Sequence, residues 1–93
     1  SALIIAAIRY PEDARKNNIE GRVITDFIID KDGKMVSPRT VRGAHHLLDK
    51  EVMRAIEVVA FIHKWEPAKL DGKPVRTRYT LPLVFEIPNQ REF

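Results

Sequence analysis

The last third of the chain carries the clearest alternation of apolar and polar residues. Between positions 75 and 87 the odd residues are Val75, Thr77, Tyr79, Leu81, Leu83, Phe85 and Ile87, and polar residues dominate the even positions. A period of two residues predicts a long β-strand with one buried face. Pro82 stands near its middle. Because proline has no backbone N–H, it favours an edge strand whose missing donor points away from the sheet.

Two earlier segments predict the other strands of a sheet. Arg22–Ile29 alternates and contains neither proline nor glycine, which is typical of an internal strand. Residues 30–34 predict a hairpin turn, because Gly33 permits a positive φ. Met35–Arg42 then returns as a strand that contains Pro38. We therefore expect Arg22–Ile29 in the centre, with the two proline-bearing strands outside.

One long amphipathic helix is predicted between the second and third strands, from about Lys50 to Ile62. Its apolar residues follow the i, i+3, i+4, i+7 rule and are Val52, Ala55, Ile56, Val59 and Ile62. Asp49 is the expected N-cap. Shorter helical turns are expected at Leu3–Ile8 and from Pro11 to Asn17. The predicted fold class is α+β, a three-stranded antiparallel sheet with helices packed on one face.

The length of 93 residues predicts a single small domain over 1–93, with a leading segment at 1–9 and a polar tail at 88–93. The absence of cysteine excludes disulfides, thiol nucleophiles and thiolate metal sites. No apolar run approaches the roughly 20 residues that span a bilayer. The chain has neither an initiator methionine nor a signal peptide, so we expect a fragment of a larger protein.

The net charge of +3 comes from 16 basic and 13 acidic side chains, and the excess lies within positions 64–78. The basic residues of this segment are Lys64, Lys69, Lys73, Arg76 and Arg78. A local basic patch steers an acidic partner toward the strand beside it, but a solvated face has the same composition. The charge pattern leaves both interpretations open.

No catalytic or metal-binding constellation is recognisable. His45 and His46 are adjacent, so they diverge in regular structure, and His63 is far along the chain. Residues 30–33 lack the later carboxylate that a calcium loop needs. No Ser/His/Asp set and no glycine-rich phosphate loop are present. We predict a protein that is not an enzyme, with no catalytic residues, no metal and no cofactor.

A succession of short motifs resembles the TonB C-terminal domain family (energy transducer TonB). These motifs are Tyr10-Pro11, Ala14, Ile19-Glu20-Gly21-Arg22-Val23, Phe27, Asp32-Gly33, Leu48-Asp49, Trp65-x-Pro67-Ala68, Gly72-Lys73-Pro74-Val75 and Pro82-Leu83-Val84-Phe85. Each motif is common alone. Their order and spacing, from about Arg9 to Ile87, together resemble this family.

The resemblance implies a periplasmic domain of a protein anchored in the inner membrane of a Gram-negative bacterium. The missing N-terminal region would join proton-driven motor proteins of the ExbB/ExbD type. The domain would capture the Ton box, a short peptide of TonB-dependent outer-membrane transporters, by β-strand addition to its last strand. It would thereby transmit proton-motive energy for active uptake of siderophores or other nutrients.

The same resemblance suggests which residues bind the peptide. If Pro82 faces outward, the even positions also present their backbone groups outward, because both groups of a residue in an antiparallel pair point to the same side. The predicted peptide-binding edge is therefore Arg76, Arg78, Thr80, Pro82, Val84 and Glu86. In the family the segment that matches Arg9, Tyr10 and Pro11 lies near the transporter, which makes these residues a further candidate contact. Packing of Tyr10 on the core is the alternative.

Three other functions remain open from the sequence. The same module resembles C-terminal domains of some membrane-bound sensors. A structural module whose edge strand pairs with a second copy would form a homodimer. A pI of 9.4 suggests nucleic-acid binding, but Glu66 and Asp71 interrupt the basic segment. We therefore expect no nucleic acid among its partners.

Overall fold

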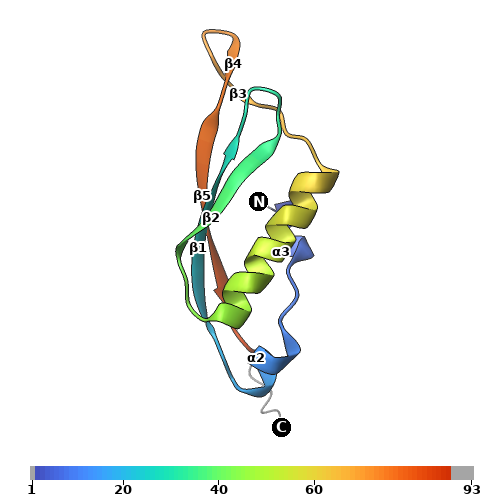
Figure 1. Ribbon diagram of the computed structural model, residues 1–93, viewed down its shortest axis with the longest axis vertical. Coiled ribbons are helices and arrows are strands. Elements are labelled where there is room, and N and C mark those ends of the chain that lie inside the picture. Colours follow the sequence, from blue (N-terminus) through green and yellow to red (C-terminus); the bar gives the residue numbers. More distant parts are fainter. Residues whose placement is uncertain (1, 89–93) are drawn as a thin grey trace.

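The computed structural model describes residues 2–88, in which helices cover one face of a three-stranded antiparallel sheet (Figure 1). The elements in chain order are α1 (Ala2–Ala7), α2 (Glu12–Lys16), β1 (Gly21–Ile29), β2 (Met35–Arg42), α3 (His46–Ile62), β3 (Ala68–Leu70), β4 (Lys73–Val75) and β5 (Thr77–Phe85). The predicted α+β fold class is confirmed. The tail beyond position 88 lies outside the described residues.

The strand order is β2-β1-β5, so the proline-free strand is central, as predicted. The two pairings differ in regularity. β1 and β5 pair without interruption from Gly21–Phe85 to Ile29–Thr77. The β1–β2 register is broken twice, between Ile24 and Thr25 and again after Asp26. The sheet therefore has one regular edge strand and one irregular edge strand.

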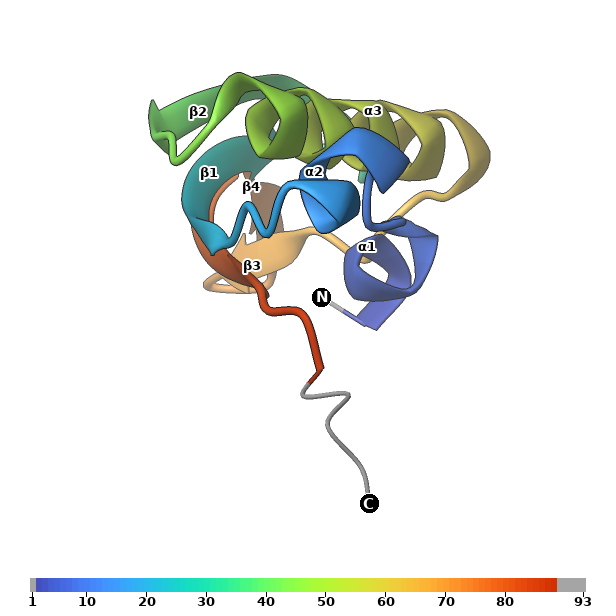
Figure 2. The same ribbon diagram turned by 90° about the horizontal axis from the view of Figure 1, so that it is seen from below.

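The core lies between the sheet and the long helix α3. Residues of β1 that face the helices, such as Val23 and Phe27, are buried against Val52 and Ile56 of α3 and against Phe85 of β5. Burial of apolar surface of this kind contributes about 25 cal/mol per Å². Figure 2 shows the strands on one side and the helices on the other. Helix α3 lies beside β2 and β1, whereas α1 lies in the same lower half of the view as β5.

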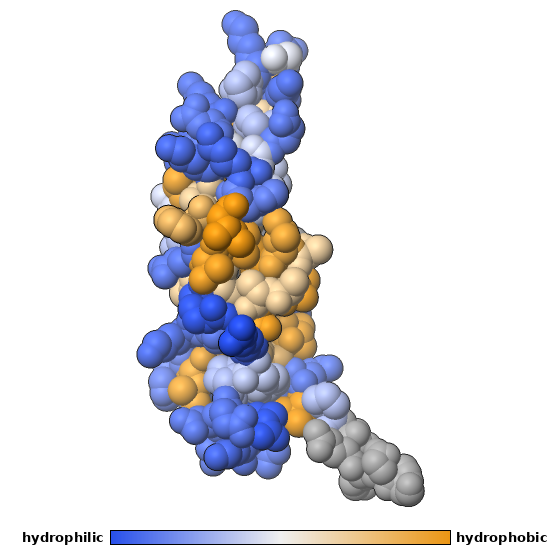
Figure 3. Space-filling view, turned by 90° about the vertical axis from the view of Figure 1, so that its right-hand side faces the viewer, coloured by the Kyte–Doolittle hydropathy of each residue, from blue (hydrophilic) through white to orange (hydrophobic). Residues whose placement is uncertain are grey.

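The last turn of α3 departs from the predicted apolar stripe. Ile62 is 70% exposed, whereas Val52, Ala55, Ile56 and Val59 are buried as predicted. This turn stands away from the sheet and leaves a hollow of about 430 Å³ above the start of β2. Figure 3 shows an apolar patch between two hydrophilic ends of the molecule. The exposed large apolar residues of α1 and α3 are Leu3, Ile5, Val58, Phe61 and Ile62.

Helix α3 begins at His46, earlier than predicted, and Asp49 is not its N-cap. The cap is His45, whose imidazole Nδ1 accepts a hydrogen bond from the Leu47 N–H at 3.1 Å. Asp49 instead accepts from the Ala44 N–H at 3.0 Å and closes the preceding loop. The His45 imidazole thus satisfies an early N–H donor of the helix, a role usually filled by a short polar side chain.

The predicted strand from position 75 to position 87 is shorter than its alternation suggests. Arg76 separates β4 from β5, and Glu86 and Ile87 follow the end of β5. β3 and β4 form a separate two-stranded hairpin around Asp71 and Gly72, whose φ angles are +53° and +79°. Side-chain alternation continues across Arg76, so the pattern alone does not reveal where the ladder stops.

Candidate functional site

The candidate site is the outer edge of β5, which we call the rim. β5 pairs with β1, and no other strand within residues 2–88 pairs with its other side. Its side chains alternate as predicted: Leu83 and Phe85 are buried toward the helices, whereas Pro82 and Val84 are exposed on the outer face of the sheet. Arg78 and Thr80 share this exposed row. Of the predicted edge residues, Arg76 and Glu86 lie just beyond the two ends of the strand.

Pro82 determines which backbone groups point to the rim. It pairs with Ile24 of β1. A hydrogen-bonded antiparallel pair needs an N–H from both residues, and proline has none, so the groups of Pro82 face away from β1. The same alternation directs the N–H and C=O groups of Arg78, Thr80 and Val84 outward. The rim thus presents a row of unpaired backbone groups that lacks one donor at Pro82.

A buried carboxylate on the outer face was not singled out by the sequence analysis. Asp26 of β1 is 3% exposed and lies between Arg39 of β2 and Arg78 of β5. Arg39 donates from Nε at 2.9 Å and from Nη2 at 3.1 Å, and Nη1 of Arg78 lies 3.6 Å from Oδ2. The hydrogen bond from Arg39 holds the pKa of Asp26 below its ordinary value, although burial opposes the shift. The sequence could have indicated this site, because Asp26 is a charged residue in the middle of an apolar strand, and a buried charge needs a partner.

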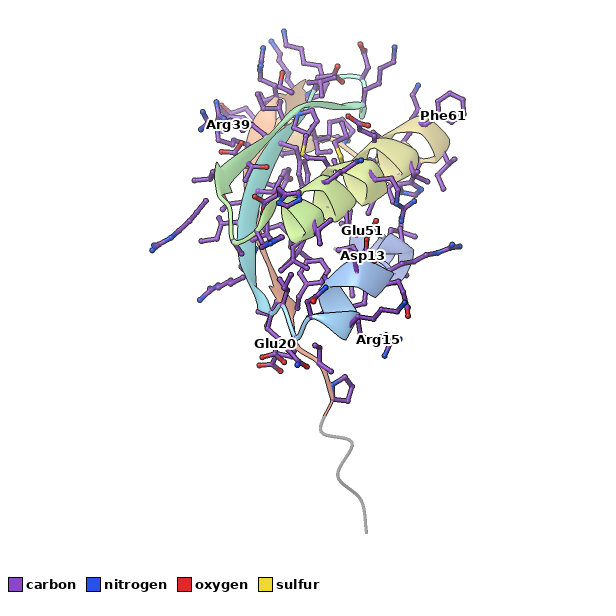
Figure 4. All side chains as sticks on the ribbon, turned by 60° about the horizontal axis from the view of Figure 1, so that its bottom comes forward. Asp13, Arg15, Glu20, Arg39, Glu51 and Phe61 are labelled. Carbon is purple, nitrogen blue, oxygen red and sulfur yellow. The ribbon has the colours of Figure 1, made fainter. Side chains whose placement is uncertain are left out.

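Contacts of Arg9 and of the following residue, Tyr10, attach the leading segment to the rest of the domain. The Arg9 N–H donates to Glu51 of α3 at 2.7 Å, and Arg54 contacts both Glu51 and the Ala7 carbonyl. Figure 4 shows Glu51 where α3 meets this segment. Burial raises the pKa of Glu51, but hydrogen bonds from Arg54 and from the Arg9 backbone outweigh it and lower the pKa overall.

Tyr10 packs at the end of β5. Its ring meets Phe85 edge-on with the centroids 5.4 Å apart, and its hydroxyl donates to the Ile19 carbonyl. Burial, followed by the charge of Glu20, raises its pKa. The side chain of Arg9 is exposed and Pro11 is half-buried. These three residues therefore lie near the Phe85 end of the strand, and the packing of Tyr10 accounts for its position.

The basic segment continues past the opposite end of the rim. Lys64 lies in the linker after α3, Lys69 and Lys73 lie on the β3–β4 hairpin, and Arg76 precedes β5; all four are exposed. In Figure 1 this hairpin extends beyond the start of β5. The positive charge is therefore concentrated at the Thr77 end of the rim.

The three histidines make two separate aromatic contacts. His45 and His46 do not diverge as predicted: because His45 caps α3 from an extended backbone, the two rings stack with centroids 4.5 Å apart. His63 packs edge-on against Trp65. Within residues 2–88, no three side chains of His, Asp or Glu are grouped to hold a metal ion. Within the same residues, no helix combines the length and the apolarity needed to cross a bilayer.

Comparison with known sequences gives a consistent result. Residues 6–87 match the family described as "Gram-negative bacterial TonB protein C-terminal". "Protein TonB" of Vibrio cholerae serotype O1 is 33% identical over 89 residues, which are 92% of this chain and 35% of that protein. The chain therefore spans about a third of the length of this relative.

Solved structures share the fold. The TonB C-terminal domain of Helicobacter pylori (residues 179–285) has a TM-score of 0.78 at 21% identity, over 96% of this chain and 78% of that one. That of Pseudomonas aeruginosa has a TM-score of 0.68 at 29% identity, over 90% and 82%. The tonb2 protein of Vibrio anguillarum has a TM-score of 0.65 at 30% identity, over 88% and 76%.

Proposed function

The chain belongs to the family of Gram-negative bacterial TonB protein C-terminal domains, and on this premise we propose that it captures an extended peptide along the rim of β5. The peptide is the Ton box of an outer-membrane transporter, and the domain works in the periplasm. Capture occurs by β-strand addition, in which main-chain hydrogen bonds supply the affinity. The proposal requires no catalytic step and no cofactor.

The observation that carries this proposal is the contrast between the two edges of the sheet. Proteins normally blunt exposed strands with bulges, prolines or charges. Each edge strand carries one proline, Pro38 in β2 and Pro82 in β5, but only β2 also has two register breaks and a positive φ, of 54° at Ser37. β5 keeps an unbroken register over its whole length. A guest strand therefore meets a regular template at β5.

The expected affinity follows from the number of new bonds. Each added backbone hydrogen bond contributes about 0.5–1.5 kcal/mol net. Arg78, Thr80 and Val84 present both groups to the rim, whereas Pro82 presents its carbonyl alone. After the cost of ordering the peptide, binding in the micromolar range, which needs roughly 8 kcal/mol, is the expected limit.

Amide hydrogen exchange with and without a Ton-box peptide tests the proposal. We expect new protection at Arg78, Thr80 and Val84, whose N–H groups point to the rim. A peptide of the same length with proline at alternate positions is the matched control, because it cannot complete the ladder. Protection confined to Thr77, Tyr79 and the other odd positions, which already bond to β1, would contradict capture at the rim.

The role of the longer protein is part of the same proposal. We propose that the rest of the protein anchors the domain to the inner membrane, where motor proteins of the ExbB/ExbD type supply proton-motive energy for uptake. We also propose Arg9, Tyr10 and Pro11 as a further transporter contact. Homodimer formation through the same rim is the competing use of β5. Sedimentation over a range of concentrations distinguishes a dimer from a monomer that binds peptide.

A further inference from the structure

The side of β5 that faces the helices is covered along only part of its length. Tyr79, Leu81, Leu83 and Phe85 all point to this side. Leu83 and Phe85 are 5% and 4% exposed, whereas Tyr79 is 42% exposed and Leu81 is half-buried. The reason is the position of α3, which packs on β1 and β2 (Figure 2). Apolar surface therefore remains open directly beside the rim.

This open surface forms a hollow of about 310 Å³. Three aromatic residues line it, together with Thr80 and Leu81: Phe27, Tyr79 and Trp65. Phe27 and Tyr79 stack with their ring centroids 6.0 Å apart. The Trp65 backbone N–H donates to the Gly33 carbonyl at 2.8 Å, which fixes the third wall. The hollow is thus present before any ligand arrives, and apolar walls of this kind are typical of binding pockets.

The geometry of an added strand brings side chains to this hollow. Successive residues of a strand point to opposite faces, so same-face residues are roughly 6.6 Å apart. A peptide paired with the rim would direct every second side chain toward the side of Tyr79 and Leu81. A second hollow of about 160 Å³, lined by Ile5, Ile8 and residues 82–85, follows further along the same side.

We propose that the hollow lined by Phe27, Trp65 and Tyr79 is a side-chain pocket that selects among captured peptides. It takes one large apolar side chain, aromatic or branched, from the helix-facing side of the added strand. Tyr79 and Trp65 are its specificity-determining residues. Backbone pairing is nearly indifferent to sequence, so selectivity has to come from pockets of this kind. This inference rests on the proposed capture of a strand at the rim.

Host–guest peptides test the pocket separately from strand capture. The probes are acetylated nine-residue peptides of threonine and serine with one central guest residue, which is Ala, Leu or Phe. Titrations followed by the amide chemical shifts of β5 measure millimolar as well as micromolar dissociation constants. We expect the Phe and Leu peptides to bind about tenfold more tightly than the Ala peptide, because the guest side chain leaves water. In Tyr79→Ser the difference should fall to about twofold or less, since one wall of the pocket is lost.

Two control variants show whether the change in guest preference is specific to the pocket. Tyr79→Phe keeps the ring and should keep the guest preference. Val41→Thr removes an exposed apolar side chain from β2, at the opposite edge, and should leave every dissociation constant unchanged. If the β5 amides respond to all peptides but the guest has no effect, or if the preference persists in Tyr79→Ser, the pocket is refuted and strand capture survives. If no peptide shifts the β5 amides, strand capture fails and the pocket fails with it.

Discussion

The carboxylate of Asp26 accepts two hydrogen bonds from Arg39, at 2.9 and 3.1 Å, beside the place where the β1–β2 register breaks. A bidentate contact of this type adds geometric specificity as well as energy. It joins the irregular strand β2 to the central strand next to an interruption of their register. Arg78 approaches the same carboxylate from β5, so one buried charge links all three strands.

The ionisation of Asp26 should make the stability of the domain depend on pH in the acidic range. Its folded pKa is lower than the ordinary value of 3.8, so the stabilisation is complete above that pH and is lost as the pH falls through the folded pKa. We expect the free energy of unfolding to decrease as the pH falls below about 4. Urea denaturation at a series of pH values measures this decrease.

The variant Asp26→Asn isolates this contribution. It removes the titrating group but keeps a polar side chain of similar size, so the dependence on acid should be shallower than in the parent domain. Asp30 and Glu51, whose pKa values are also lowered, still contribute to the pH dependence of stability in this variant. An Asp26→Asn curve parallel to that of the parent would show that the Arg39 contact does not stabilise the ionised carboxylate.

Replacement of Gly33 by alanine should destabilise the domain strongly. Gly33 has a φ of +84°, and a Cβ there would lie 2.1 Å from the Trp65 carbonyl oxygen. Backbone strain and the clash together should cost about 3 kcal/mol or more. Gly72→Ala is the matched control, since Gly72 has a φ of +79° with no neighbour within 4 Å, and should cost about 1 kcal/mol. Equal losses in the two variants, measured by urea denaturation, would argue against a tight Gly33–Trp65 contact.

A second proline on the rim should weaken peptide binding without unfolding the domain. The Val84 N–H points away from β1, so Val84→Pro removes one donor to the guest and none to the sheet. The loss of one hydrogen bond should raise the dissociation constant about two- to tenfold. Val84→Thr alters the side chain but keeps the N–H, and so serves as the comparison in peptide titrations. If both variants bind equally well, this N–H does not contact the peptide.

Loss of Glu51 should loosen the attachment of Arg9 to α3. Glu51→Ala removes the acceptor of the Arg9 N–H and the ionic partner of Arg54. We expect faster amide exchange at Arg9 and a loss of about 1 kcal/mol in stability, because the contact is partly solvated. Glu12→Ala breaks an exposed ion pair with Arg15 and should cost less than about 0.5 kcal/mol. Unchanged exchange at Arg9 in Glu51→Ala would contradict this anchoring role.

The sequence predicted the features that depend on local pattern. Pro82 and the alternation around it predicted an edge strand, and the absence of proline from Arg22–Ile29 predicted the centre; both are confirmed. The predicted start of α3, at about Lys50, was wrong, because a histidine cap is not a common helix signal. The backbone break at Arg76 was also missed, since the side-chain period runs through it.

Contacts between distant segments could not be predicted in the same way. Asp26 meets Arg39 across a bulged pairing, where the sequence separation does not reveal the register. The aromatic hollow requires Trp65 to return to Gly33, a contact across 32 positions of the chain. Such contacts follow from how the elements pack, which residue spacing does not encode.

The unbroken pairing of β1 with β5 has a mechanical consequence. Tension along the strands loads the bonds of a regular ladder together, in shear, so that no single bond has to yield first. The irregular pairing of β1 with β2 lacks this continuity and should give way in steps. We therefore expect the β1–β5 half of the sheet to be the stiffer one, and a strand added at the rim would extend that half.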